Sequence, residues 1–158
     1  MGIAVVIIAT LMVMAAWFGT HLIPMAQAVD AVSLASGPKT NEIIYHAVHG
    51  RWPSPGNSHV VGDNGNGRYA RNLTLDAGGV ITAELVLDPL AGIRATASAA
   101  GARTIHGSLS FRPELLGTRD APAIVFVCGY AKPVRGPAAM SGVNKTTIDR
   151  KFLPPFCR

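Results

Sequence analysis

The chain has 158 residues, a formal net charge of +5 and 49% hydrophobic residues. This length suits one domain with at most a short appendage. Only 15% of the residues are charged, which excludes intrinsic disorder of the whole chain, because disorder requires low hydrophobicity and high charge. The 11 Pro and 17 Gly residues argue against an all-helical bundle beyond the N-terminal segment.

The first 29 residues are uncharged and mostly apolar. Thr10 is the only polar residue between Ile3 and Phe18, and the first charged residue is Asp30. As a helix, this segment would cover ~40 Å, enough for the ~30 Å hydrocarbon core of a bilayer. Pro24 is expected to bend that helix, because it removes one amide donor.

Two interpretations of this segment remain open. We favour a retained transmembrane helix over residues 1–29, because the uncharged stretch is long and no basic residue precedes it. The alternative is a secretory signal cleaved after the small-x-small motif Ala26-Gln27-Ala28. Both interpretations place residues 30–158 outside the cytoplasm as a globular head.

The head is predicted to begin with a short helix. Apolar positions at helical spacing run from Glu42 to Val48, and Gly50 is the expected C-cap. We expect Ser36-Gly37-Pro38 to interrupt the helical pattern before it. Residues 51–67 are rich in Pro, Gly, Asn and Ser, which predicts a long loop.

Four strand signals follow within residues 68–128. The predicted strands are Arg68–Leu75, Val80–Leu87, Ile105–Phe111 (ending before Pro113) and Ala123–Cys128. The first two are joined by a turn over residues 76–79. Short connections between successive strands favour an antiparallel meander, and a helix on one face completes an α+β domain.

Cys128 and Cys157 are the two cysteines of the chain. Export would place them in an oxidising compartment, which favours a disulfide that closes a loop over residues 128–157. Closing such a loop contributes about 3–4 kcal/mol by restricting the unfolded chain. The alternative is two free thiols. A metal site is disfavoured, because further ligands at close spacing are missing.

Signals for catalysis are weak. Glu42, His46 and His49 could share one helix face as metal ligands, but a polar helix face at a loop boundary is the favoured interpretation. No Ser-His-Asp pattern or phosphate-binding Gly loop stands out in the sequence. We therefore expect no enzyme activity, no cofactor and no metal.

The C-terminal part of the chain is basic. Residues 101–158 hold nine Lys or Arg against three acids, a net charge of +6. Such a surface attracts polyanions, including DNA, without sequence preference. A solvated surface or contacts between subunits is the favoured interpretation. The candidate polyanion contacts are Lys132, Arg135, Lys145, Arg150 and Lys151.

Several segments of the chain form a familiar combination. They are the long apolar N-terminal helix, a helix ending in GRWP, the segments at 33–42, 67–82 and 105–113, and the terminal FLPPFCR taken with Cys128. Together they resemble a type IV pilin with a C-terminal disulfide loop. The resemblance covers nearly the whole chain. It implies the pilin fold, with a long N-terminal helix packed on a four-stranded antiparallel meander and a disulfide-closed C-terminal loop.

The resemblance also suggests a processing site. Family members are cut after a Gly, and here Gly2 is the candidate, because Ile3 lies at the family's spacing before Pro24. The acid that members carry at their fifth mature residue would fall at Ile7, where this chain has none. Members at the filament tip can lack this acid, so the resemblance allows a minor or tip subunit beside a shaft subunit.

The resemblance implies a structural role. The precursor would lie in the bacterial inner membrane with a periplasmic head, and the assembly machinery would transfer it into an extracellular filament of like subunits. Such a filament would serve adhesion to host or abiotic surfaces, or surface motility. DNA uptake by a minor subunit, and a membrane-anchored accessory protein that does not assemble, are the alternatives.

Overall fold

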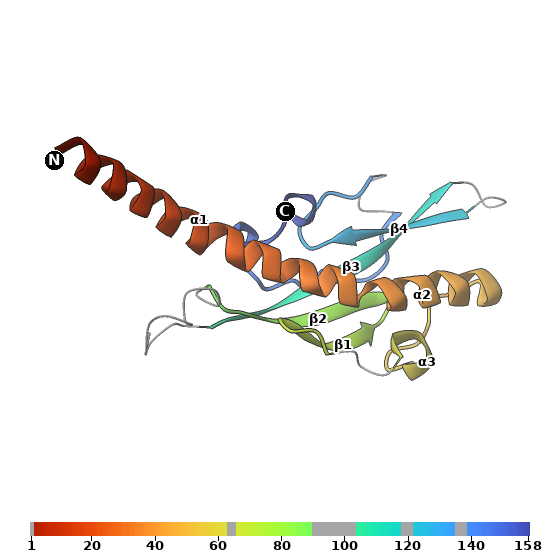
Figure 1. The fold of residues 1–158 in the computed structure, drawn as a ribbon. Coiled ribbons are helices and arrows are strands. Elements are labelled where there is room, and N and C mark those ends of the chain that lie inside the picture. The colour runs from red at the N-terminus through yellow and green to blue at the C-terminus, as the bar shows by residue number, and fades with distance from the viewer. Residues whose placement is uncertain (1, 63–65, 90–103, 118–121, 135–138) are drawn as a thin grey trace.

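The computed structural model describes residues 2–62, 66–89, 104–117, 122–134 and 139–158. A long helix lies against a four-stranded antiparallel sheet, and the C-terminal segment is closed by a disulfide (Figure 1). This is the predicted α+β architecture. The strands follow one another in the order β1-β2-β3-β4, which confirms the predicted meander.

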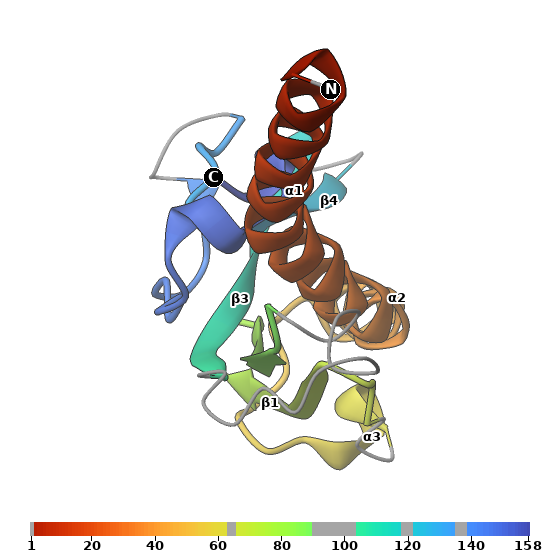
Figure 2. The ribbon, with the colours of Figure 1, turned by 60° about the vertical axis from the view of Figure 1, so that its left-hand side comes forward.

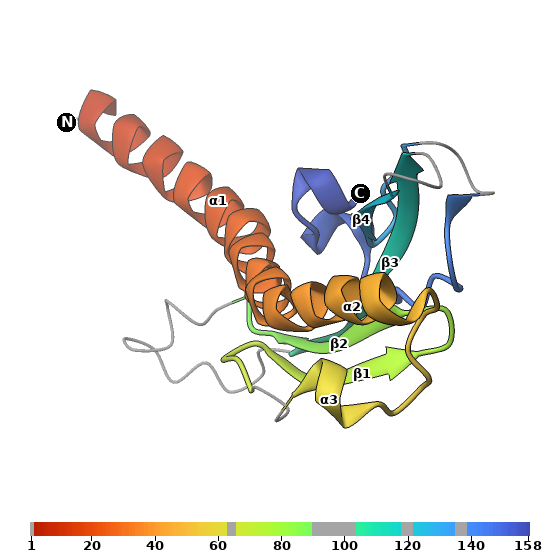
Figure 3. The same cartoon turned by 90° about the vertical axis from the view of Figure 1, so that its right-hand side faces the viewer.

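Two helices follow each other almost without a break. Helix α1 spans Gly2–Leu34 and α2 spans Ser36–His49. The predicted interruption is found at Ala35 rather than at Ser36-Gly37-Pro38, which are helical. Backbone hydrogen bonds from Ala35 N to Ala31 O and from Lys39 N to Ala35 O continue across the junction. Pro38 is tolerated because it lies in the first turn of α2, where amide hydrogens lack partners in their own helix. The axis changes direction near this junction (Figure 3).

The end of α2 is confirmed, and the segment after it holds an additional helix. Gly50 has φ 65°, and its amide donates to His46 O at 2.8 Å, as in a glycine C-cap. The short helix α3, Ser58–Val61, lies inside the predicted loop. Asn57 supports its start, because its side-chain oxygen accepts from the amide of His59. A four-residue helix is too short to produce a hydrophobic repeat.

The strands are β1 (Ala70–Asp76), β2 (Val80–Leu87), β3 (Ile105–Gly117) and β4 (Pro122–Cys128). The predicted end of the third strand before Pro113 is wrong, because β3 continues to Gly117 and pairs Pro113 with Phe126 on β4. Pro113 O accepts from Ser141 N, so the peptide groups of Pro113 point away from β4. The missing amide hydrogen therefore costs the β3–β4 ladder nothing.

The second half of α1 covers one face of the sheet, while the first half projects beyond the head (Figures 1 and 2). Ala28, Ala31 and Ala35 are fully buried, and small side chains at this spacing let the helix backbone approach the sheet closely. Phe111 and Ile81 are the largest fully buried side chains of the core. One helix thus belongs both to the core of the head and to an uncovered apolar surface.

Candidate functional site

The first half of α1 is an exposed apolar surface. Every residue from 2 to 18 is exposed, and Ile3, Met12 and Val13 keep 80%, 70% and 71% of their surface. The 33 residues of α1 extend over ~50 Å. In the part of the chain that the structure describes, α1 with its continuation α2 is the one helix long and apolar enough to cross a membrane. This surface, here called the apolar rod (residues 2–18), needs lipid or other apolar helices around it.

The apolar rod carries no charge. Ile7 is 51% exposed, at the position where the resemblance would place an acid. The hydroxyl of Thr10 donates to Val6 O and Ile7 O at 3.1 and 2.8 Å, so it is satisfied inside the helix. The candidate processing site, Gly2–Ile3, lies in the first turn of α1.

Gln27 connects α1 to the end of β2. Its side-chain amide donates to Asp88 O, and its side-chain oxygen accepts from Asp88 N, both at 2.7 Å. Gln27 is only 5% exposed, and its neighbour Ala28 is fully buried. The residues that resemble a signal cleavage motif therefore hold the helix against the head.

Asp30 makes the second connection, to the start of β1. Its carboxylate oxygen accepts from the amides of Tyr69 and Ala70 at 2.7 and 3.2 Å. Gly67 is required nearby, because a Cβ at this position would collide with the Asp30 carboxylate. Sequence reasoning missed the role of Gln27 and Asp30; its one signal was that Asp30 is the first charge after 29 uncharged residues.

The predicted disulfide between Cys128 and Cys157 is present, with Cα atoms 4.6 Å apart. Cys157 is fully buried and Cys128 is 7% exposed. Tyr130 N donates to Cys157 O at 2.9 Å, which pairs the end of β4 with the C-terminal turn. The disulfide therefore ties the last residues of the chain to a strand of the core.

The rest of the C-terminal segment is fixed to β3 and α1. The amides of Ser108 and Ser110 donate to the hydroxyls of Thr147 and Thr146 at 2.9 and 3.1 Å. At the end of the chain, Arg158 donates to Leu153 O at 2.8 Å and approaches Met25 Sδ on α1 at 3.8 Å. The loop after β4 therefore has many fixed points, although its sequence has little regular hydrophobic pattern.

The candidate polyanion contacts are partly neutralised. Lys145 pairs with Asp76 at 2.6 Å and Lys151 with Asp149 at 3.2 Å. The guanidinium of Arg150 lies 4.8 Å from the ring centre of Tyr130, and Lys132 is exposed. Arg135 lies outside the described residues. The structure thus leaves Lys132 and Arg150 as the exposed cations of this set that pair with no described carboxylate.

The predicted histidine face does not form a metal site. Glu42 is fully buried, whereas His46 packs on Trp52 with ring centres 4.2 Å apart. His49 stacks on Tyr45 with ring centres 4.1 Å apart. Within the described ranges, no three His, Cys, Asp or Glu side chains converge as metal ligands.

Two ionisable groups on α2 are shifted by burial. Burial raises the pKa of Glu42 from 4.5 to about 8 and lowers the pKa of Lys39 from 10.5 to about 8. The Lys39 ammonium lies 3.7 Å from the ring centre of Phe111, a favourable contact with the ring face. Sequence reasoning noted Glu42 but did not predict its burial.

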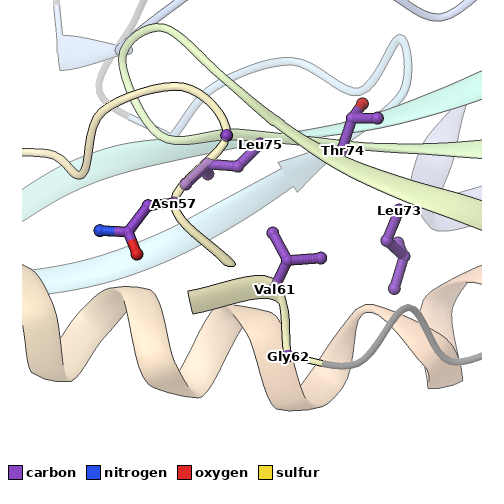
Figure 4. A pocket seen from close by; sticks show the side chains of 7 residues that line it. Asn57, Val61, Gly62, Leu73, Thr74 and Leu75 are labelled. Atoms are coloured by element: carbon purple, nitrogen blue, oxygen red, sulfur yellow. The ribbon is translucent and has the colours of Figure 1, made fainter. Parts of the chain in front are cut away.

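Two shallow pockets flank α3. The larger, about 360 Å³, lies between α3 and β1 (Figure 4), and the other, about 250 Å³, lies between α2 and α3. The described residues that line the larger pocket carry no charged side chain, so they offer no acid–base pair. Its lining residues are Gly56, Asn57, Val61, Gly62, Leu73, Thr74 and Leu75.

Comparison with known proteins gives two relatives. No family model matches the chain. Two proteins from Neisseria gonorrhoeae, both named type IV major pilin protein PilE1, are each 30% identical to it over 142 residues, which cover 84% of the chain. The match covers 69% of one relative and 58% of the other. A match of this extent includes most of the head.

Proposed function

Because the chain belongs to the type IV pilin family, we propose that it is a structural filament subunit that serves cell adhesion or surface motility. Residues 1–29 act as the membrane and assembly helix, and residues 30–158 form the periplasmic and later extracellular head. Before assembly, α1 anchors the precursor in the bacterial inner membrane. The assembly machinery there moves it into a filament of like subunits.

The exposed apolar rod supports this proposal most directly. Its side chains are uncovered along residues 2–18, so they require an apolar surrounding. Lipid tails and neighbouring helices both supply one, and moving the rod from one to the other changes its free energy little. A subunit can therefore leave the membrane and enter a filament without exposing the rod to water.

A matched pair of substitutions tests assembly. We expect Val6→Lys in the apolar rod to abolish filament incorporation, since a lysine amid hydrocarbon costs about 2.5–3.5 kcal/mol. Val48→Lys makes the same change at a 73% exposed position on α2 and should leave incorporation near the wild-type level. Immunoblots of sheared surface filaments measure both variants. Wild-type incorporation of Val6→Lys would contradict the proposal.

Loss of the gene tests the purpose of the filament. A deletion strain should lose adhesion to surfaces or spreading over them, and the wild-type chain should restore the lost property. The segments 51–67 and 128–157 are the head surfaces offered to host or abiotic surfaces. Unchanged adhesion and motility in the deletion strain would leave assembly intact as a proposal but would contradict this purpose.

Ile7 distinguishes a shaft subunit from a tip subunit. Family members in the shaft carry an acid at this position, whereas members at the filament tip can lack it. Gold-labelled antibody against the chain tests which role it has. Label at the filament ends indicates a tip subunit, and label along whole filaments indicates a shaft subunit. Introducing the acid in Ile7→Glu should then move label from the ends to the shaft. Label that stays at the ends in this variant would show that position 7 does not decide placement.

DNA binding for uptake is the alternative function. The exposed Lys132 and Arg150 and the net charge of +6 over residues 101–158 favour it. DNA retention should fall steeply with added salt and should weaken in the double variant Lys132→Glu, Arg150→Glu. The control is the double variant Arg68→Glu, Arg71→Glu, which makes the same change in charge at the start of β1. It should have little effect on DNA retention. No retention of the wild-type chain at low salt would exclude this function.

A further inference from the structure

Glu42 is a buried carboxyl group that makes no hydrogen bond with any residue the structure describes. It is fully buried, and both of its carboxyl oxygens lack a partner. It lies against Gly79 in the β1–β2 turn, and the ring of Trp52 lies against the same glycine. A Cβ at position 79 would collide with Glu42 Oε1. The carboxyl group thus fills the contact between α2 and this turn.

This contact depends on the protonation state of Glu42. A neutral carboxyl group can remain in an apolar contact at moderate cost, whereas a carboxylate without a partner is far more costly to bury. Gly79 has φ 73° and no side chain, so the turn offers the carboxylate no side-chain donor. Ionisation therefore favours movement of Glu42 towards water.

The other ionisable groups around this contact already have partners. On α2, the Lys39 ammonium lies over the Phe111 ring, and the His46 ring packs on Trp52. Beside the turn, Asp76 pairs with Lys145 and accepts from the hydroxyl of Thr82. Among these described groups, none forms an ion pair with Glu42 that would hold its charge in place.

We propose that the contact of α2 with the β1–β2 turn is a pH-sensitive latch, closed while Glu42 is protonated and opened when Glu42 ionises. Opening moves the end of α2 and Trp52 away from the turn, and with them the start of the segment 51–67. Because this segment belongs to the surface of the head, the latch links pH to the shape of that surface. The latch lies within the head and does not depend on filament assembly.

Trp52 reports on the latch directly. The chain has two Trp residues, so the full-length Trp17→Phe protein in detergent micelles leaves Trp52 as the only fluorophore of this type. Between pH 6 and 10 we expect its emission to shift to longer wavelength, with a midpoint near pH 8, where the pKa of buried Glu42 lies. An emission maximum that stays constant over this range would overturn the proposal.

Three variants in the same background assign the transition. Glu42→Gln replaces the neutral acid by an amide of the same shape and should abolish the shift, while His46→Gln and Lys39→Met should keep it. A shift that persists in Glu42→Gln, or that disappears in Lys39→Met, would overturn the proposal.

Trypsin supplies a measurement that needs no substitution. Cleavage after the exposed Arg51 should speed up several-fold between pH 7 and pH 9, relative to cleavage after the exposed Lys151 in the same digest. A constant ratio of the two rates would also overturn the latch.

Discussion

Lys39 and Glu42 show how two side chains one turn apart on α2 can make the stability of the head depend on pH in opposite directions. Folded Glu42 keeps its proton up to about pH 8, whereas the unfolded side chain loses it near 4.5. Folded Lys39 loses its proton near 8, whereas the unfolded side chain keeps it to 10.5. Each difference in bound protons changes the free energy of unfolding by up to about 1.4 kcal/mol per pH unit.

The first prediction is a minimum of stability near pH 8. The unfolding free energy should fall from pH 4.5 to 8, because the folded state then binds the extra proton on Glu42. It should rise from pH 8 to 10.5, because the unfolded state then binds the extra proton on Lys39. Denaturant unfolding across this range measures the profile. Glu42→Gln should remove the fall and Lys39→Met the rise; a variant with an unchanged profile would contradict the assignment.

The second prediction concerns Asp30. Asp30→Ala leaves the amides of Tyr69 and Ala70 without their carboxylate acceptor and should lower the unfolding free energy by about 2–3 kcal/mol. Ser33→Ala changes an exposed position on the same helix and serves as the control, with an expected change within about 0.5 kcal/mol. Equal losses of unfolding free energy in the two variants would show that the hydrogen bonds of Asp30 add no stability to the head.

The sequence was least informative about single side chains whose role depends on the tertiary fold, such as Gln27, Asp30 and Glu42. Gln27 and Asp30 act on segments about 40 to 60 residues away along the chain, and local patterns carry no signal for such distant partners. The burial of Glu42 was missed for a different reason, because an acid on a helix normally faces water. The two cysteines were paired correctly because composition and compartment decide that pairing with little help from geometry.

At the scale of elements, periodicity predicted the strands and capping predicted the end of α2. The hairpin of β1 and β2 follows from two alternating segments around a Gly-rich turn, and Gly50 ends α2 as expected. Two errors, at Pro38 and Pro113, came from the assumption that a proline ends a helix or a strand. Pro38 lies where a helix start needs no amide hydrogen, and Pro113 faces away from β4.

The third prediction concerns the disulfide that closes residues 128–157. Replacing both cysteines by Ser should lower the unfolding free energy by about 3–4 kcal/mol, because the unfolded chain regains the freedom of a long loop. Urea unfolding of the full chain, with and without reductant, measures the effect. The double variant should be insensitive to reductant. A loss below about 1 kcal/mol would show that the contacts of Arg158, Thr146 and Thr147 hold the segment alone.

At the scale of the whole molecule, one helix serves two surroundings. Its second half is a component of the core of the head, and its first half is an apolar rod that the described part of the head leaves uncovered. The α+β fold and this division could be predicted from the sequence, because a long uncharged segment before a strand-rich region allows few other arrangements. The direction of the bend between α1 and α2 could not be predicted, since it depends on how the helix packs on the sheet.

The most direct test of the central claim is mass spectrometry of filaments sheared from the source cell. We predict that peptides of the head, residues 30–158, occur in the filament fraction and that the mature N-terminus begins at Ile3. Recovery of the chain only in the inner-membrane fraction, with Met1 retained, would contradict its role as a filament subunit. A soluble form beginning at Val29 would contradict the role of α1 as a retained anchor.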